Sequence, residues 1–312
     1  MKKFVMPLVM GMVLVMSGLG WSGQSTAKLD KKQLREGLAS RIEGAIKQKR
    51  PQAQVDLCPS DVALKRIKPT SVSIQDKQIP LYAVKANIAS PVRNGQASTV
   101  RMVVDQSGEH QLSIKNVSNG SSLVQAAKDM VRRKELNKDW GNTVFNGGGS
   151  HNVLLVSDPF CGYCRKAVSW FLDHQDSIGE LRVMHVPFSK KVGGDVASWA
   201  FKDGADTVEP GKLLRFVYTH LEPLEKNATE KDKRSILRQM MEEFPALKEK
   251  WGSPKTGYYY LKGKVQKDLE KEARIAQQEL EVRATPGVFV NGIPVKGWNP
   301  QRYSELLAKK AE

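Results

Sequence analysis

The sequence predicts an α/β protein with a small α+β domain at its N-terminus and a larger α/β domain that carries a helical insertion. Three patterns support this class. β-rich runs separated by turn signals fill the first domain, an apolar β run leads directly into a helix near the middle of the chain, and a short β-hairpin followed by a helix ends the sequence. Nearly ninety residues of helical periodicity separate the last two features.

The first 27 residues have the layout of a secretory signal peptide. Lys2 and Lys3 precede an uncharged apolar run from Phe4 to Met16, and small residues ending at Ala27 follow. The run of about 13 residues is shorter than the roughly 20 needed to cross a bilayer, which argues against the alternative, a membrane anchor. We therefore expect residues 1–27 to be cleaved and the mature protein to be soluble and exported to the periplasm, an oxidising compartment.

The chain is strongly basic. It carries 49 Lys and Arg against 33 Asp and Glu, a formal charge of +16. The basic residues are intermixed with acidic ones along the chain, and no nucleic-acid-binding motif accompanies them. We interpret the charge as a solvated basic surface and expect no nucleic-acid partner.

Residues 28–120 predict the α+β domain. Apolar residues at every fourth position from Leu34 to Ile46 indicate an amphipathic helix, which Pro51 ends. Strand patterning follows between Ile67 and Val117, with Ser107-Gly108 as a hairpin turn.

Residues 121–150 are expected to connect the two domains. A helical pattern extends to Trp140, with Ser121 or Ser122 as its N-cap. The glycine-rich stretch that follows, Asn146–Ser150, predicts a flexible hinge.

Residues 151–312 form the predicted α/β domain. The continuous apolar run Val153–Val156 indicates a buried strand, and a helix is expected to begin at or just after Cys161. Cys164 falls on the apolar stripe of that helix and should point inward, whereas Cys161 lies at the exposed helix start.

The rest of this domain completes a recognisable element order. A strand, "ELRVMHVPF", precedes the helical insertion at about residues 195–281. Asn291-Gly292 is a two-residue hairpin signal between two short strands, and Asn299 with Pro300 predicts the start of a final helix. The order strand, CxxC helix, strand, helices, β-hairpin, helix predicts a thioredoxin-like fold with a helical insertion.

Two cysteines in "CGYC" are suited to redox chemistry. A thiolate at a helix N-terminus faces unpaired N–H groups and the positive end of the helix dipole, which lower its pKa below the free value of about 8.5. We therefore expect Cys161 to attack disulfides and the shielded Cys164 to resolve the mixed disulfide. Such exchange needs no cofactor.

Other functions of the pair fit the sequence less well. A zinc or copper carrier would need about four ligands, and His151, His174 and His185 are not at ligand spacing around the one CxxC, so we expect no metal. An inert structural disulfide would constrain the unfolded chain little, because it closes so short a loop. A periplasmic chaperone that binds unfolded chains without redox chemistry stays an alternative.

The chain resembles the bacterial periplasmic thiol:disulfide interchange family of DsbC and DsbG. "CGYC" matches the DsbC active-site tetrapeptide, "ATPGVFVNG" resembles the family's cis-proline loop, and the strands between Ile67 and Val117 are similar to its N-terminal dimerisation domain. The helical insertion and the N-terminal helix look longer than in DsbC. A DsbG-like role or a DsbA-like dithiol oxidase therefore stays open, and so does a trimer.

The resemblance implies a disulfide isomerase that rearranges wrong disulfides in misfolded client proteins. It also implies a DsbD-like membrane thiol reductase that keeps the pair reduced, and a homodimer formed through residues 28 to about 120. Six residues carry the implied roles: Cys161 as the nucleophile, Cys164 as its partner, Gly162 and Tyr163 as tuning residues, and Thr285 and cis Pro286 as the substrate-binding loop.

The third cysteine and a run of three tyrosines lie outside the motifs described above. Cys58 has no obvious partner, so we expect it to be buried, with a bridge between subunits as the alternative. The three consecutive tyrosines at 258–260 are expected to pack in a core rather than to line a peptide-binding surface.

Overall fold

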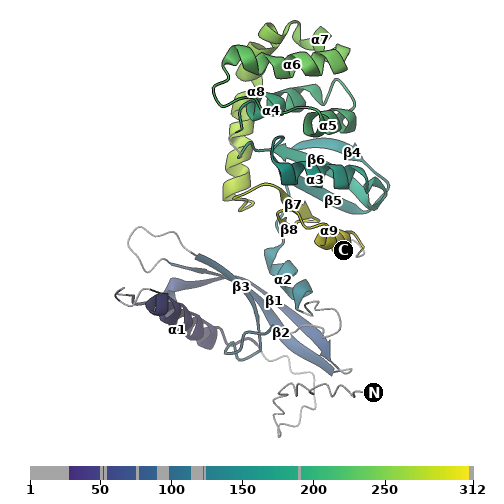
Figure 1. The fold of residues 1–312 in the computed structure, drawn as a ribbon. Helices are drawn as coiled ribbons and strands as arrows, with labels where there is room; N and C mark the ends of the chain where they lie inside the picture. Colours follow the sequence, from purple (N-terminus) through teal and green to yellow (C-terminus); the bar gives the residue numbers. More distant parts are fainter. Residues whose placement is uncertain are drawn as a thin grey trace, which may run out of the picture.

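The computed structural model describes residues 28–49, 52, 55–74, 77–89, 98–113, 122, 124–188 and 191–308, so the predicted signal peptide lies outside the described residues. Two domains follow one another along the chain, with helix α2 (Gln125–Arg132) between them (Figure 1). Among the described helices, none is both long enough and apolar enough to cross a membrane.

The N-terminal domain is a three-stranded antiparallel sheet between two helices. The strand order is β1-β2-β3, and alternate side chains of β2 face opposite helices. Val84 packs in the cluster that includes Leu34 of α1, whereas Ala83 packs in the cluster that includes Val131 of α2. The elements are α1 (Lys31–Lys49), η1 (Pro59–Asp61), β1 (Val62–Ile74), β2 (Lys77–Ile88) and β3 (Ser98–Val104).

The predicted hairpin at Ser107-Gly108 is shorter than expected. The chain does turn there, and Gly108 has φ +77°, with Leu34 and Asp30 so close that a Cβ would lie 2.9 Å from each. In the described residues the returning strand is a single bridge between Val104 and Gln111. Residues 114–117, expected to continue it, lie outside the described residues.

The connecting helix is also shorter than predicted. It ends at Arg132 instead of Trp140, and Val124, not a serine, is its N-cap. The chain leaves the helix because the next residues contact the second domain, where the backbone N–H of Lys134 donates to the carbonyl oxygen of Gly292 at 2.8 Å.

The second domain has the thioredoxin-like arrangement, a five-stranded sheet of order β4-β6-β5-β7-β8. β5 and β6 are parallel and joined through α3, and all other pairs are antiparallel. Asn291 and Gly292 have φ values of 47° and 79°, as the two-residue turn requires. The elements are β4 (Asn142–Asn146), β5 (His151–Ser157), α3 (Gly162–Leu172), η2 (Gln175–Ser177), β6 (Ile178–His185), β7 (Gly287–Val290), β8 (Ile293–Lys296) and α9 (Pro300–Leu307).

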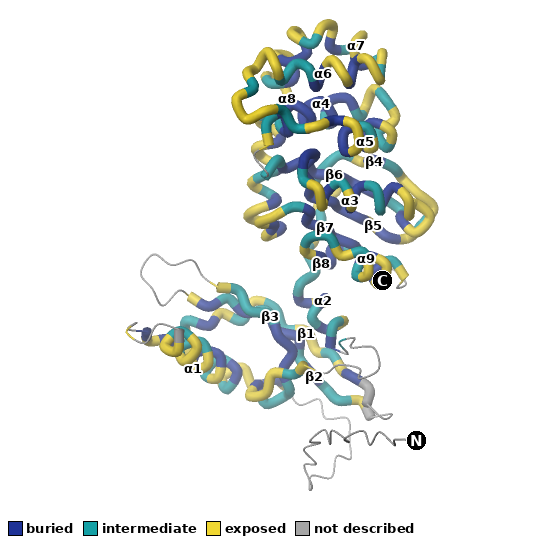
Figure 2. The backbone as a smooth tube through the Cα atoms, in the orientation of Figure 1, coloured by how far each residue is buried: buried dark blue, intermediate teal, exposed yellow. Residues whose placement is uncertain are grey.

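The helical insertion between β6 and β7 matches its expected extent. In Figure 1 most of its helices lie to one side of the sheet while its last and longest helix runs down beside the sheet, and in Figure 2 the interior of the sheet and of the insertion is buried. Tyr258 is 2% exposed, but Tyr259 and Tyr260 are 50% and 42% exposed, so the expected core position holds for Tyr258 alone. The helices are α4 (Gly194–Gly204), α5 (Pro210–Thr219), α6 (Glu230–Glu243), α7 (Pro245–Trp251) and α8 (Pro254–Gln278).

The prediction of a flexible hinge at Asn146–Ser150 is wrong. β4 pairs with β6, so this loop connects two strands of one sheet and does not join the domains. The Gly147 N–H donates to the carbonyl oxygen of Gly179 at 2.8 Å, and a Cβ on Gly147 would lie 2.2 Å from the carbonyl oxygen of Ile178. Glycine is needed here for close packing, and the domains are joined instead by residues 133–141.

Candidate active site

Cys161 lies where β5 runs into α3. β5 ends at Ser157, and a tight turn follows in which the Asp158 side chain accepts a hydrogen bond from the Phe160 N–H at 3.0 Å. The Cys161 N–H then donates to the Asp158 carbonyl oxygen at 3.1 Å. Cys161 is the N-cap residue of α3, as the sequence predicts, and its thiol therefore faces the free N–H groups of the first turn.

The two cysteines have different environments. Cys161 is half-buried, whereas Cys164 is 0% exposed and packs in the core beside Phe160 and Val168. The backbone N–H of Asp158 donates to the Cys164 sulfur at 3.4 Å. The predicted asymmetry, one accessible and one shielded thiol, is present in the structure.

The pKa values of the two thiols follow this difference in exposure: the accessible thiol has a lowered pKa and the buried thiol has a raised pKa. The hydrogen bond from the Cys164 thiol is the largest influence on Cys161; it outweighs burial and, with the N–H groups of Cys164 and Tyr163, lowers the pKa of Cys161 to about 5. Burial raises the pKa of Cys164, and the bond to Cys161 raises it further. The lowered pKa of Cys161 was expected from the helix start; the largest single cause is the neighbouring Cys164 thiol, and N–H groups of the first helical turn add to it.

The predicted cis-proline loop lies against the cysteine pair. The Thr285–Pro286 peptide bond is cis, and the Thr285 carbonyl oxygen lies 3.6 Å from the Cys161 sulfur. β7 begins at the next residue, Gly287, which pairs with Val156 of β5. The antiparallel pairing of β5 and β7 therefore brings Thr285 and Pro286 to the same edge of the sheet as Cys161.

The two residues between the cysteines lie at the surface. Tyr163 is 60% exposed, with the Lys166 ammonium 5.8 Å from its ring centre, and a Cβ on Gly162 would meet nothing within 4 Å. On the next turn, the Arg165 guanidinium binds the Glu222 carboxylate at 2.7 Å. This ion pair holds the segment after α5 next to the first turn of α3.

Sequence reasoning missed a buried polar group of residues behind Cys164. Ser157 ends β5, His185 ends β6 and Tyr218 lies on α5, and each is at most 1% exposed. Only the tertiary fold brings them together, and the one local signal was a serine at the end of an apolar run, directly before the active-site turn.

The three histidines that could contribute metal ligands lie in different surroundings. His151 Nδ1 lies 3.0 Å from the Asn291 amide nitrogen, and the His174 ring stacks on Trp170 at 3.9 Å. Within the described ranges, no group of three or more His, Cys, Asp and Glu side chains is placed to hold a metal ion.

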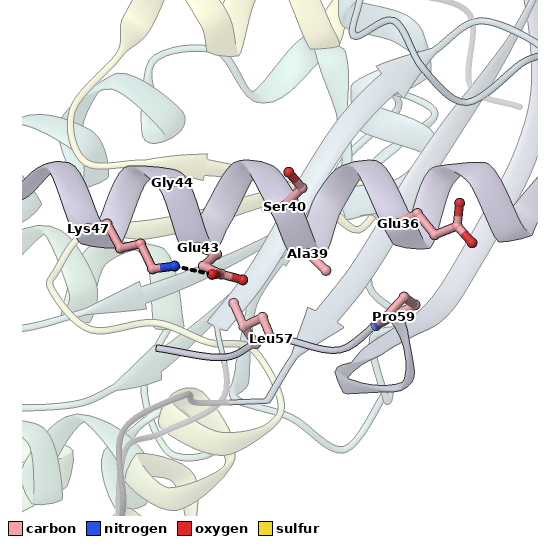
Figure 3. Close-up of a pocket in the computed structure, with 8 residues that line it drawn as sticks. All are labelled: Glu36, Ala39, Ser40, Glu43, Gly44, Lys47, Leu57 and Pro59. Carbon is pink, nitrogen blue, oxygen red and sulfur yellow. Dashed lines mark hydrogen bonds and ion pairs between the residues drawn. The ribbon is translucent and has the colours of Figure 1, made fainter. Parts of the chain in front are cut away.

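Cys58 is exposed, which contradicts the expectation that it is buried. It is the N-cap residue of η1, and its N–H donates to the Asp61 carboxylate at 2.9 Å, so the turn keeps it at the surface. Its neighbours Leu57 and Pro59 face α1 across a hollow of about 400 Å³, with Glu36 and Glu43 on the helix side (Figure 3).

Solved structures of thiol-exchange proteins are similar to part of this chain. They include a thioredoxin-like oxidoreductase from Silicibacter pomeroyi (16% identity, TM-score 0.42), which covers 55% of this chain and 93% of its own. Chlamydia trachomatis DsbA has 15% identity and a TM-score of 0.41, with 55% and 92% covered. The thiol-disulfide exchange protein α-DsbA2 from Wolbachia pipientis has 12% identity and a TM-score of 0.40, with 59% and 91% covered.

None of these three is described as a DsbC or DsbG protein. No protein-family model matches the chain, and no curated protein sequence matches it either. Because their TM-scores are below 0.5, these similarities are too weak to support the fold. The thioredoxin-like assignment rests on the chain's own strand order.

Proposed function

We propose that this protein is an exported thiol–disulfide oxidoreductase, and more specifically a disulfide isomerase similar to the DsbC and DsbG proteins. The observation that carries the proposal is the contrast between Cys161, half-exposed with a pKa lowered to about 5, and Cys164, fully buried with a raised pKa. At neutral pH the first is a thiolate and the second a thiol, which are the nucleophile and the resolving group of disulfide exchange.

The reaction begins when a client disulfide reaches Cys161. The Cys161 thiolate attacks one client sulfur, a mixed disulfide forms, and the other client sulfur leaves as a thiolate that takes up a proton. Thr285, with its carbonyl oxygen 3.6 Å from Cys161, offers backbone groups to an extended client strand beside the attacked bond. A client thiol then resolves the mixed disulfide, which isomerises the client, or Cys164 does, which leaves the pair oxidised.

The N-terminal domain supports the isomerase proposal. β1 pairs only with β2 in the described sheet, so it presents an edge of 13 residues, and such edges pair readily with another chain. We propose that two copies associate through residues 28 to about 120 and hold a misfolded client between two active sites. A membrane thiol reductase similar to DsbD would keep the pair reduced, and the leader sequence supports export to the periplasm.

A dithiol oxidase is the second candidate, and one observation favours it. The hydrogen bonds that lower the pKa of Cys161 stabilise the reduced pair, and a stabilised reduced pair is a stronger oxidant. The redox state of the Cys161–Cys164 pair in cells separates the two functions. A mostly reduced pair supports the isomerase, and a mostly oxidised pair supports the oxidase.

The proposed chemistry is tested with protein substrates. The purified mature protein should reactivate scrambled ribonuclease, and the Cys161→Ser variant should not. Cys164→Ser should accumulate mixed disulfides with clients, visible as bands that reducing agent removes, because the resolving thiol is missing. If Cys164→Ser traps no more client than Cys161→Ser does, the roles assigned to the two cysteines are wrong.

A further inference from the structure

Three buried polar atoms behind the active site have no hydrogen-bond partner among the described residues. They are the Ser157 hydroxyl oxygen, the Tyr218 hydroxyl oxygen and the His185 Nε2 atom. All three residues are at most 1% exposed. Because buried polar groups nearly always form hydrogen bonds, three unpaired atoms in one region indicate a role other than stability.

The three residues lie on one side of the sheet. Ser157 and His185 are register partners on the parallel strands β5 and β6, so their side chains share a face. The His185 ring centre lies 5.8 Å from that of Tyr218. Burial lowers the pKa of His185 to about 3, so its imidazole is neutral at physiological pH.

The Ser157 hydroxyl lies between Tyr218 and Cys164. It is near enough to the Cys164 sulfur and to the Tyr218 oxygen to offset part of the burial that raises the pKa of each group, although no hydrogen bond is formed in the resting site. The next residue, Asp158, already donates its N–H to the Cys164 sulfur at 3.4 Å. The Ser157 hydroxyl is therefore a second potential donor near the same sulfur, and the Tyr218 hydroxyl is near Ser157.

We propose that Ser157 is a catalytic hydrogen-bond donor to Cys164, and that Tyr218 is the positioning residue that orients its hydroxyl. This inference rests on the proposed function. In the resting pair, Cys164 shares its proton with the Cys161 thiolate. That acceptor is lost once Cys161 is in a mixed disulfide, and hydrogen bonds that are long in the resting site tighten as charge develops on Cys164.

The step that these hydroxyls assist is the resolution of the mixed disulfide. Cys164 gives up its proton, which passes through solvent to the leaving client sulfur, and the Cys164 sulfur attacks the Cys161 sulfur. The Cys161–Cys164 bond forms, the bond from Cys161 to the client sulfur breaks, and the client sulfur leaves as a thiolate and takes up a proton. The cysteine pair is oxidised by two electrons and the client is reduced by two.

The test separates the two halves of the exchange with oxidised glutathione, which requires no client protein. Rapid mixing and acid quenching, followed by mass spectrometry, give the rate of attack by Cys161 and the rate of resolution by Cys164. Ser157→Ala should slow resolution about tenfold or more, the effect expected for a lost hydrogen bond to a charged group, and change the attack rate less than twofold. Tyr218→Phe should slow resolution severalfold.

A double variant distinguishes positioning from simple loss of packing. Because Tyr218 acts through Ser157, Tyr218→Phe should have no further effect in the Ser157→Ala background. Tyr303→Phe is the matched control, since Tyr303 is equally buried but its hydroxyl donates to the Gly297 carbonyl oxygen. This control should resolve at the wild-type rate.

Three results would overturn the proposal: an unchanged resolution rate in Ser157→Ala, fully additive effects in the double variant, or equal slowing of attack and resolution. A different set of results would contradict the proposed isomerase function while leaving the role of Ser157 intact. In that case the wild-type protein resolves the glutathione adduct, and the variants slow this step, but scrambled ribonuclease is not reactivated. A wild-type pair that forms no adduct with glutathione overturns both proposals.

Discussion

The ammonium group of Lys134 lies 3.1 Å from the Glu281 carboxylate and 2.7 Å from the Glu279 carbonyl oxygen. Lys134 belongs to the segment that joins the domains, and Glu281 belongs to the loop that leads into the cis-proline. Lys85 of β2 and Arg101 of β3 bind the same carboxylate. A single acidic residue near the active site therefore connects the second domain to three cations of the first domain and the joining segment.

Replacement of Glu281 should loosen this contact. Glu281→Gln removes the charge that the three cations bind, so trypsin should cut within residues 133–141 about two- to fivefold faster, in line with the modest strength of partly exposed ion pairs. Glu279→Gln is the control, because Glu279 contributes only its backbone oxygen. Equal cleavage rates in the two variants would show that the Glu281 ion pairs do not hold the two domains together.

The same contact should weaken in acid. Burial alone would raise the pKa of Glu281, but the hydrogen bond from Lys134 and the charge of Arg101 lower it to about 2. The contact favours the charged carboxylate, so it is at full strength above about pH 4.5 and is lost as the pH falls toward 2. The difference in cleavage between wild type and Glu281→Gln should shrink over that range, measured with an acid-stable protease.

The thiolate of Cys161 should depend on its neighbour. In a Cys58→Ser background, absorbance at 240 nm should give a midpoint of about 5 for Cys161, and Cys164→Ala should raise this pKa because the largest stabilising hydrogen bond is lost. Cys164→Ser keeps a donor and should lie between the two. A midpoint near the free value of about 8.5 in the intact pair would contradict the site geometry.

The sequence predicted the parts of the site that depend on local patterns. The strand before Cys161, the helix start, the buried position of Cys164 and the Asn291-Gly292 turn each follow from a few adjacent residues. The cis bond at Pro286 was expected from the family resemblance, because a Thr-Pro pair alone does not specify it.

The failed predictions involve partners distant in the sequence. Three glycines in a row indicate a flexible linker unless it is known that β6 packs against them. The helix before them ends early because Lys134 binds Gly292, a residue about 160 positions later. Ser157, His185 and Tyr218 meet only after β5, β6 and α5 have packed, and no short pattern in the chain joins them.

Removal of the N-terminal domain should separate reduction from isomerisation. The shortened chain should begin at Glu135 and not at Gly147, because β4 belongs to the second sheet and Arg182 binds the carbonyl oxygens of Asn137 and Trp140. We expect a monomer that still reduces insulin but has lost most isomerase activity. Light scattering and scrambled-ribonuclease assays test both halves, and a shortened chain that isomerises as well as the whole would exclude a role for the first domain in isomerisation.

Labelling of Cys58 should report on the surface of the first domain. In the oxidised protein Cys161 and Cys164 are joined, so an exposed Cys58 is the one thiol left to react, and a maleimide should label it once per chain at pH 7. Cys58→Ser should not be labelled. Native protein that resists labelling and reacts only after unfolding would show that Cys58 is covered in solution. A dimer band on nonreducing electrophoresis that is absent in Cys58→Ser would show instead that this thiol bridges two subunits.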